Sequence, residues 1–309
     1  MNLRWFSRTE IDKNKWDACI DQCSWGKVYA QSWYLDLLTN SQWEALVLGN
    51  YDLVMPIPFR RKFGIRYSYR PNFCQQLGVF CANSILEPKI LSLFIDEFLK
   101  KYKHFHYPLN HANVLLNSDK FDFVERTNLL LNLNQPYALI YDGYADDLKR
   151  NLKKAQKAGL ELIKNLGNSD LINLYKSAWQ KKNEIPENEY EGFRKIMEFG
   201  TKNQFSWNVG ILKDGQLLAA CCLIKYKKRL YYPFSAISED GRKYGATAFL
   251  IDEIIKQNAN SDFCLDFEGS DIQTVKFFYQ KFKPRREIYF QLDKILPIKQ
   301  IFSSLFEKS

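Results

Sequence analysis

Two strand–turn–strand segments in the chain share one pattern. WEALVLGNYDLVMPIPF (43–59) and WNVGILKDGQLLAACCLI (207–224) each start with an apolar strand led by tryptophan, pass through a polar turn and end in a second apolar strand. A helix is predicted after each, at 88–102 and at 247–258. A repeat separated by half the chain indicates duplication of one α/β unit, although two unrelated halves that share a hairpin would give the same pattern.

The duplication predicts the fold class and the domain boundary. We expect an α/β (α+β) protein with two tandem domains, each a mostly antiparallel mixed sheet flanked by helices. Turn signals at Asn134-Gln135-Pro136 and at Asp142-Gly143 mark the link between the halves. A boundary near Asn134 divides the chain into an N-terminal domain, 1–134, and a C-terminal domain, 135–309.

The charge balance favours an acidic partner. The 44 basic residues exceed the 35 acidic ones and give a net charge of +9, which suits a nucleotide-containing cofactor, a phosphorylated substrate or RNA. A strongly basic helix is predicted in YADDLKRNLKKAQKAGLELI (144–163), with Gly159 as its C-terminal stop. Its cations either form a solvated face or contact phosphate or RNA.

Membrane, disulfide and metal signals are absent from the sequence. The longest apolar run, Leu217 to Ile224, is far too short to span a bilayer, and the first residues do not resemble an export signal. Seven cysteines without CxxC spacing indicate reduced, mostly buried thiols. His104, His106 and His111 have no ligand at metal-site spacing. We therefore expect a soluble cytoplasmic protein with no membrane insertion and no metal.

A basic, glycine-containing segment follows the strand predicted at 230–236. Small residues that open a helix leave backbone amides accessible to a pyrophosphate, and the positive end of the helix favours such an anion. We expect this segment to be a loop that binds a pyrophosphate. Its candidate residues are Arg242, Lys243, Tyr244, Gly245, Ala246 and Thr247.

A second candidate site lies in LDFEGSDIQTVKFFYQKFKP (265–284), where an apolar strand ends in two carboxylates and a helix follows. Strand alternation predicts that Asp266 and Glu268 share a face opposite Phe267. Glu268, or Asp266 as its alternate, is a candidate general base. Both carboxylates can equally cap the next helix or hold the corner by hydrogen bonds.

These motifs resemble the GNAT acyltransferase superfamily. Arg242 to Thr247 is similar to its [Q/R]-x-x-G-x-[G/A] acyl-CoA pyrophosphate loop, with Thr247 at the last position. FFYQKFKP (277–284) resembles the helix that carries a tyrosine able to protonate the departing thiolate, which implies Tyr279. YRPNFCQQLGVF, KRNLKKAQKAGLELI and the duplication extend the resemblance to the FemAB-like and BioF2-like branch, which has two tandem GNAT-like domains.

The resemblance implies an N-acyltransferase that moves an acyl group from acyl-CoA to a small-molecule or peptide amine bound between the two domains. The branch also contains enzymes that transfer an amino acid from aminoacyl-tRNA to a peptidoglycan precursor. Phe278-Tyr279 and Phe282-Lys283 depart from those enzymes' motif, and 170–200 shows no coiled-coil heptads. CoA is therefore preferred over tRNA as the donor. A non-catalytic binding protein on this scaffold is the third possibility, and no DNA partner is expected.

Substrate-binding residues are predicted in both halves. Parting of neighbouring strands in a GNAT-like sheet implies that Tyr231 to Ser235, including Tyr232, line the donor channel, and Pro233 suits an interrupted ladder. Arg70 either pairs with an acceptor phosphate or carboxylate or stabilises the turn at Pro71. Only the C-terminal half has a basic donor loop, so the first half is expected to bind the acceptor. Its candidates are Tyr69, Arg70, Gln75 and Gln76.

Overall fold

The computed structural model describes residues 2–62, 64–83, 85–114, 121–179, 185–269 and 272–294. The chain forms two compact units: unit 1 contains residues 1–126 and 288–309, and unit 2 contains 127–287. The chain passes between the units twice, inside strand β7 (Asp122–Asn132) and inside strand β13 (Arg285–Lys294). The predicted boundary near Asn134 lies just after the end of β7. The division into two duplicated domains stays a prediction.

Unit 1 is built on a mostly antiparallel sheet. Its strand order is β1-β2-β3-β4-β6-β13, with β5 paired to β3 and only β4 and β6 paired in parallel among the described strands. The strands are β1 (Leu3–Ser7), β2 (Trp43–Leu48), β3 (Leu53–Lys62), β4 (Ile65–Ser68), β5 (Phe80–Cys81) and β6 (Phe105–Pro108). The helices are α1 (Lys13–Gln22), α2 (Ser32–Thr39) and α3 (Pro88–Lys101), with short 3-10 turns at Arg8–Glu10 and Val28–Ala30.

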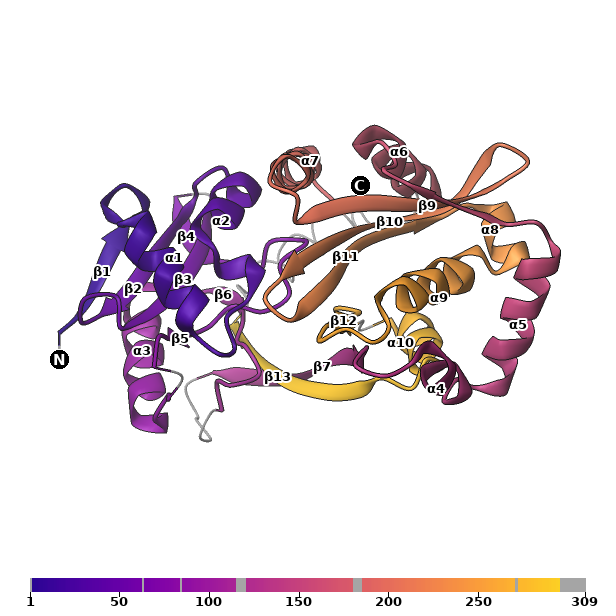
Figure 1. The fold of residues 1–309 in the computed structure, drawn as a ribbon. Helices are drawn as coiled ribbons and strands as arrows, with labels where there is room; N and C mark the ends of the chain where they lie inside the picture. The colour runs from indigo at the N-terminus through magenta and orange to yellow at the C-terminus, as the bar shows by residue number, and fades with distance from the viewer. Residues whose placement is uncertain are drawn as a thin grey trace, which may run out of the picture. The chain divides into compact units, whose positions relative to one another are not determined.

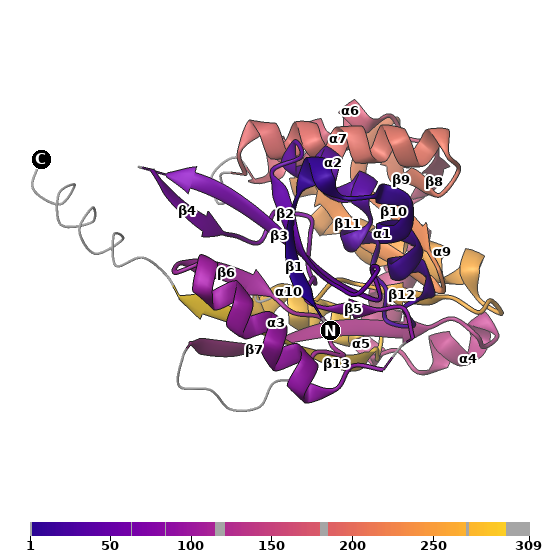
Figure 2. The same cartoon turned by 90° about the vertical axis from the view of Figure 1, so that its left-hand side faces the viewer.

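Strand β2 shows why helices cover both faces of this sheet. Trp43 packs against Trp16 of α1, with ring centroids 5.0 Å apart. The next residue, Glu44, accepts a hydrogen bond of 2.8 Å from Tyr102 and pairs with Lys101 at the end of α3. Because adjacent strand residues point to opposite faces, α1 and α3 lie on opposite sides of β2, as Figure 2 shows.

Unit 2 contains the second predicted sheet. Its strands follow the order β7-β12-β11-β10-β9-β8, and only β11 and β12 pair in parallel among those described. The further strands are β8 (Glu161–Lys164), β9 (Ser206–Lys213), β10 (Gln216–Tyr226), β11 (Arg229–Ile237) and β12 (Cys264–Asp266). The helices are α4 (Tyr137–Asp142), α5 (Asp146–Lys157), α6 (Asn168–Trp179), α7 (Glu187–Lys202), α8 (Glu239–Tyr244), α9 (Ala246–Asn258) and α10 (Gln273–Gln280).

Helices cover both faces of the unit 2 sheet. Phe234 of β11 stacks on Tyr175 of α6, with centroids 4.4 Å apart, and also contacts Phe193 of α7. Tyr232 of the same strand belongs to the core formed with α9 and α10. Figure 1 shows α6 and α7 on one side of β9–β11, and α9 and α10 on the other. The predicted mixed sheet flanked by helices is confirmed.

Both predicted hairpins and the helices after them are present, but the donor segment differs from the prediction. Arg242, Lys243 and Tyr244 lie in helix α8 and not in a loop. Ser238 caps this helix by accepting a hydrogen bond of 3.0 Å from the Gly241 amide, which satisfies a backbone donor that a helix would otherwise leave unpaired. Within the described ranges, no helix is both long and apolar enough to cross a membrane.

Candidate active site

Strands β11 and β12 separate in the middle of unit 2. They pair at Arg229–Cys264, Leu230–Leu265 and Tyr231–Asp266, after which β12 ends. Strand β11 continues to Ile237, and no described strand pairs with its last residues on that side. The two strands thus part after Tyr231, as expected for a GNAT-like sheet.

The other edge of β11 is irregular at the same level. Tyr231 lies opposite Ile224 of β10 and Phe234 lies opposite Cys222, so Tyr232 and Pro233 together face a single residue of β10. Proline lacks the amide proton that a regular ladder requires, and bulges accommodate such a residue. Pro233 thus lies in a bulge on the β10 side, and its predicted place in the donor channel stays a prediction. Tyr231 and Tyr232 are both buried here.

Tyr279 of α10 lies beside this separation. Its ring stacks on Phe267, with centroids 4.9 Å apart, and meets Tyr232 edge to face at 6.3 Å. Burial raises the pKa of the Tyr279 hydroxyl well above its usual value, and the neighbouring Ser235 hydroxyl partly opposes that rise. A phenol with a raised pKa stays protonated at neutral pH. Tyr279 is thus able to donate a proton but not to act as a resting base.

Glu268 follows the end of β12 in a left-handed conformation, with a φ of 60°. Its amide donates a hydrogen bond of 2.9 Å to Asp266 Oδ1. Burial raises the pKa of the Cys222 thiol to about 12, and the Glu268 carboxylate adds to this rise. The same carboxylate also adds to the rise in the pKa of the Tyr279 hydroxyl. The expectation that Asp266 and Glu268 share a face by strand alternation is wrong, because the strand ends at Asp266.

Asp266 belongs to a buried ion network. Arg229 donates to Asp266 Oδ2 at 2.7 Å and to Glu287 Oε1 at 2.6 Å. Burial opposes the charge on Arg229, but Asp266 and Glu287 together raise the pKa of its guanidinium. Both carboxylate oxygens of Asp266 therefore accept a hydrogen bond, Oδ2 from Arg229 and Oδ1 from the Glu268 amide. These contacts favour a structural role that holds β11 and β12 together just before they separate.

The donor segment places small residues at the start of α9. Gly245 has a φ of 69° and ends α8, and α9 begins at Ala246. The first intrahelical bond runs from the Phe249 amide to the Gly245 carbonyl, so the preceding amides have no acceptor in the helix.

Arg242 is exposed. Lys243 pairs with Asp240 at 2.8 Å, and Tyr244, also exposed, lies under the Lys213 ammonium group.

The predicted acceptor residues all lie in unit 1. Tyr69 and Arg70 follow β4 and are half-buried; the Arg60 guanidinium lies 4.1 Å from the centre of the Tyr69 ring. Gln75 and Gln76 are buried. The Gln76 amide donates to Gln75 Oε1 at 3.0 Å, and its own oxygen accepts from the His111 amide at 3.2 Å. The two glutamines therefore contribute to local structure, and their acceptor role stays a prediction.

Cysteine and histidine chemistry adds no further site. All seven cysteines are thiols, six of them buried and Cys264 half-buried. His106 pairs with Asp293, with 2.6 Å between Nδ1 and Oδ1. In the part of the chain that the structure describes, no group of three histidine, cysteine or acidic side chains could hold a metal ion.

Comparison with known proteins agrees with this geometry. Residues 144–273 match the family model described as an acetyltransferase (GNAT) domain. FemX has the same fold, with a TM-score of 0.64 and 11% identity over 97% of this chain and 99% of its own. L-PGS from Bacillus licheniformis gives a TM-score of 0.57 and 13% identity over 94% of this chain and 95% of its own. No curated protein sequence matches significantly.

These findings confirm the predicted resemblance. Residues 144–273 match a GNAT-type acetyltransferase domain, and nearly the whole chain shares the fold of FemX. Sequence reasoning missed Arg229 and Glu287, which position Asp266. Arg229 follows two lysines in a basic turn, and Glu287 lies between charged and apolar residues near the C-terminus. Neither residue carries a local signal that distinguishes it from a solvated surface charge.

Proposed function

We propose that the chain is an N-acyltransferase that moves an acyl group from acyl-CoA to a small-molecule or peptide amine. The proposal depends on one observation: β11 and β12 separate after Tyr231 and Asp266, directly beside the buried hydroxyl of Tyr279. The edge of β11 beyond Tyr231, with which no described strand pairs on that side, is where an extended donor would lie. Tyr279 offers a proton at the same place.

The reaction needs one proton acceptor and one proton donor. The amine nitrogen attacks the thioester carbonyl carbon, an amide bond forms and the carbon–sulfur bond breaks. Glu268 takes the proton that the amine loses, directly or through water, and Tyr279 gives its proton to the departing thiolate. Ser235 already opposes the rise in the Tyr279 pKa, so its hydroxyl is placed to stabilise the phenolate that this transfer leaves.

The start of α9 supports a pyrophosphate-containing donor. Ala246 and Thr247 place amides without an acceptor inside the helix at the positive end of the 13-residue α9, and Gly245, whose own amide bonds back to Arg242 of α8, leaves open space beside them. This arrangement favours anions. Arg242 forms no ion pair with any residue in the described ranges. Its guanidinium is therefore available for a phosphate oxygen.

Aminoacyl-tRNA is the alternative donor. Two observations favour it: the shared fold with FemX over nearly the whole chain, and the exposed cations of α5. Among the described residues none of these cations forms an ion pair, and such a helix face suits phosphate contacts. They are Arg150, Lys153, Lys154 and Lys157.

Thermal-shift titration separates these donors. A ligand that binds only the folded protein raises its melting temperature. We expect acetyl-CoA and CoA to stabilise the protein. Arg242→Ala should raise the Kd for these ligands about fivefold, a loss of roughly 1 kcal/mol of binding free energy. Lys202→Ala, which removes another exposed unit 2 cation, should leave this Kd unchanged. Stabilisation by charged tRNA alone would establish the alternative donor, and no response to either ligand would favour a non-catalytic scaffold.

A further inference from the structure

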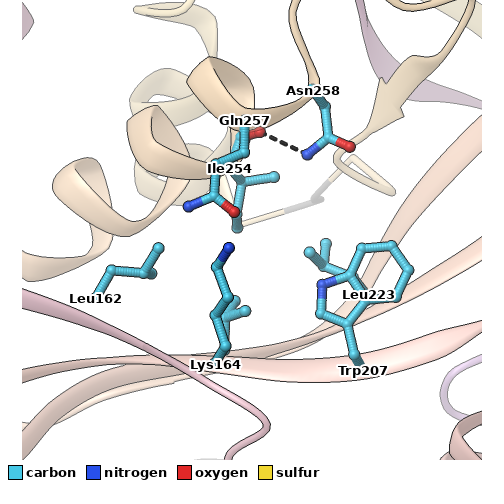
Figure 3. A pocket seen from close by; sticks show the side chains of 8 residues that line it. Leu162, Lys164, Trp207, Leu223, Ile254, Gln257 and Asn258 are labelled. Atoms are coloured by element: carbon cyan, nitrogen blue, oxygen red, sulfur yellow. Dashed lines mark hydrogen bonds between the residues drawn. The ribbon is translucent and has the colours of Figure 1, made fainter.

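Unit 2 contains a cavity that lies apart from the proposed donor site. It has a volume of about 220 Å³ and lies between β8–β10 and the C-terminal end of α9 (Figure 3). Leu162 and Leu223 of the sheet and Ile254 of α9 are apolar residues of its lining. The proposed pyrophosphate site lies at the other end of α9, and a helix of 13 residues separates its two ends by roughly 20 Å.

Lys164 occupies an unusual position in this cavity. In β8 it follows Leu162 by two residues, and strand alternation therefore places both side chains on the same face of the sheet. Leu162 packs against the unit 2 core, and Lys164 pairs in register with the buried Val209 of β9. Figure 3 shows its ammonium group pointing into the cavity toward Gln257. A cation thus extends from a row of apolar side chains.

Two other polar groups line the same cavity. The Trp207 indole nitrogen lies on the side of its ring that faces Lys164, and the Gln257 amide lies across the cavity (Figure 3). Within the described part of the chain, neither Trp207 nor Gln257 has a hydrogen-bond partner for these groups, and Lys164 has no ion pair. Lys164 and Gln257 are exposed and Trp207 is half-buried, so three hydrogen-bonding groups that solvent can reach converge beside the apolar residues of the cavity.

We propose that this cavity binds a small monocarboxylate with an apolar body. The carboxylate would accept hydrogen bonds from the Lys164 ammonium group and the Trp207 indole N–H, and the apolar body would cover Leu162, Leu223 and Ile254. A single cation suits a single negative charge. The volume of about 220 Å³ is below the roughly 300–1,000 Å³ of sites for drug-sized ligands, which selects a smaller molecule.

Calorimetric titration with 3-phenylpropanoate and its neutral amide, 3-phenylpropanamide, tests the site. The two probes share an apolar body, so their difference isolates the charge. We expect the carboxylate to bind the full chain at least about fivefold more tightly than the amide, since hydrogen bonds to charged groups contribute more than neutral ones. Lys164→Gln should weaken carboxylate binding about tenfold. Lys202→Gln, which changes an exposed lysine of α7 outside the cavity, is the matched control.

Three results would overturn the proposal: no heat of binding from the carboxylate, equal affinity for the two probes, or an affinity unchanged by Lys164→Gln. The comparison of the two probes uses only the natural chain and holds even if a variant fails to fold. Saturating acetyl-CoA should leave the carboxylate affinity unchanged. Competition between them would place the carboxylate in the donor site and refute a separate one.

Discussion

Replacing Arg229 by methionine would leave two buried carboxylates without their cation. Asp266 is 1% exposed and Glu287 is 7% exposed, and the guanidinium lies 2.7 Å and 2.6 Å from their oxygens. Removing one partner from a buried ion pair costs about 3–5 kcal/mol. Because 17% of the Arg229 side chain is exposed, water can reach the vacated position. We therefore expect a loss near the lower limit, about 3 kcal/mol.

Urea unfolding followed by circular dichroism measures this loss. The penalty in Arg229→Met comes from negative charge that has lost its partner, and acid neutralises carboxylates. The destabilisation should therefore be larger at neutral pH than in acid.

A charge-neutral variant provides the control. Arg229→Met combined with Asp266→Asn and Glu287→Gln removes all three charges and should recover most of the lost stability, because the penalty comes from unpaired charge. The reasoning would be refuted if this triple variant were as unstable as Arg229→Met, or if the destabilisation were independent of pH.

Three further predictions test other parts of the chain. Tyr279→Phe should lower kcat about 100-fold in a thiol-release assay and leave the Kd for CoA unchanged; full activity would exclude Tyr279 as the acid. Gly241→Ala should lower the free energy of unfolding more than Gly245→Ala, because a Cβ at Gly241 would lie 2.3 Å from a backbone oxygen. At Gly245 only the φ of 69° opposes substitution, at a cost of about 1 kcal/mol. Equal losses in the two variants would contradict this. Burial raises the pKa of Asp36, but hydrogen bonds from Arg8, Trp43 and Lys13 outweigh it and lower the pKa to about 2. The stability lost in Asp36→Asn should therefore be constant above about pH 4 and disappear as the pH falls toward about 2; a difference that persists in acid would count against these bonds.

The hairpins were predictable because their signals are local. In 43–59 and 207–224, apolar strands flank turns that contain glycine or aspartate, which tolerate left-handed backbone, and the structure places Gly49, Asp214 and Gly215 in that conformation. Helix α8 also had a local signal, since Ser238 precedes two acidic residues in the pattern of a capped helix start. That signal predicts a helix start in the segment whose resemblance to a pyrophosphate loop predicted a loop.

The rest of the site depends on contacts between distant segments. Arg229, Asp266 and Glu287 meet only because β11 and β12 pair in parallel and because β13 begins beside them. Glu268 adopts a positive φ that no local feature of a glutamate favours. Strand alternation therefore did not extend to Glu268, two residues after the strand end. The candidate tyrosine was predicted from its motif, but its burial against Phe267 and Tyr232 required the folded chain.

The path of the chain through β7 and β13 has a consequence for synthesis. Residues 291–294 of β13 pair with β6 of unit 1, although the whole of unit 2 separates these strands in sequence. A ribosome makes unit 1 first but releases its last strand only after unit 2 has emerged. We therefore expect unit 2 to fold on the nascent chain before unit 1 can close its sheet. The half of the protein that is made first is the half that is finished last.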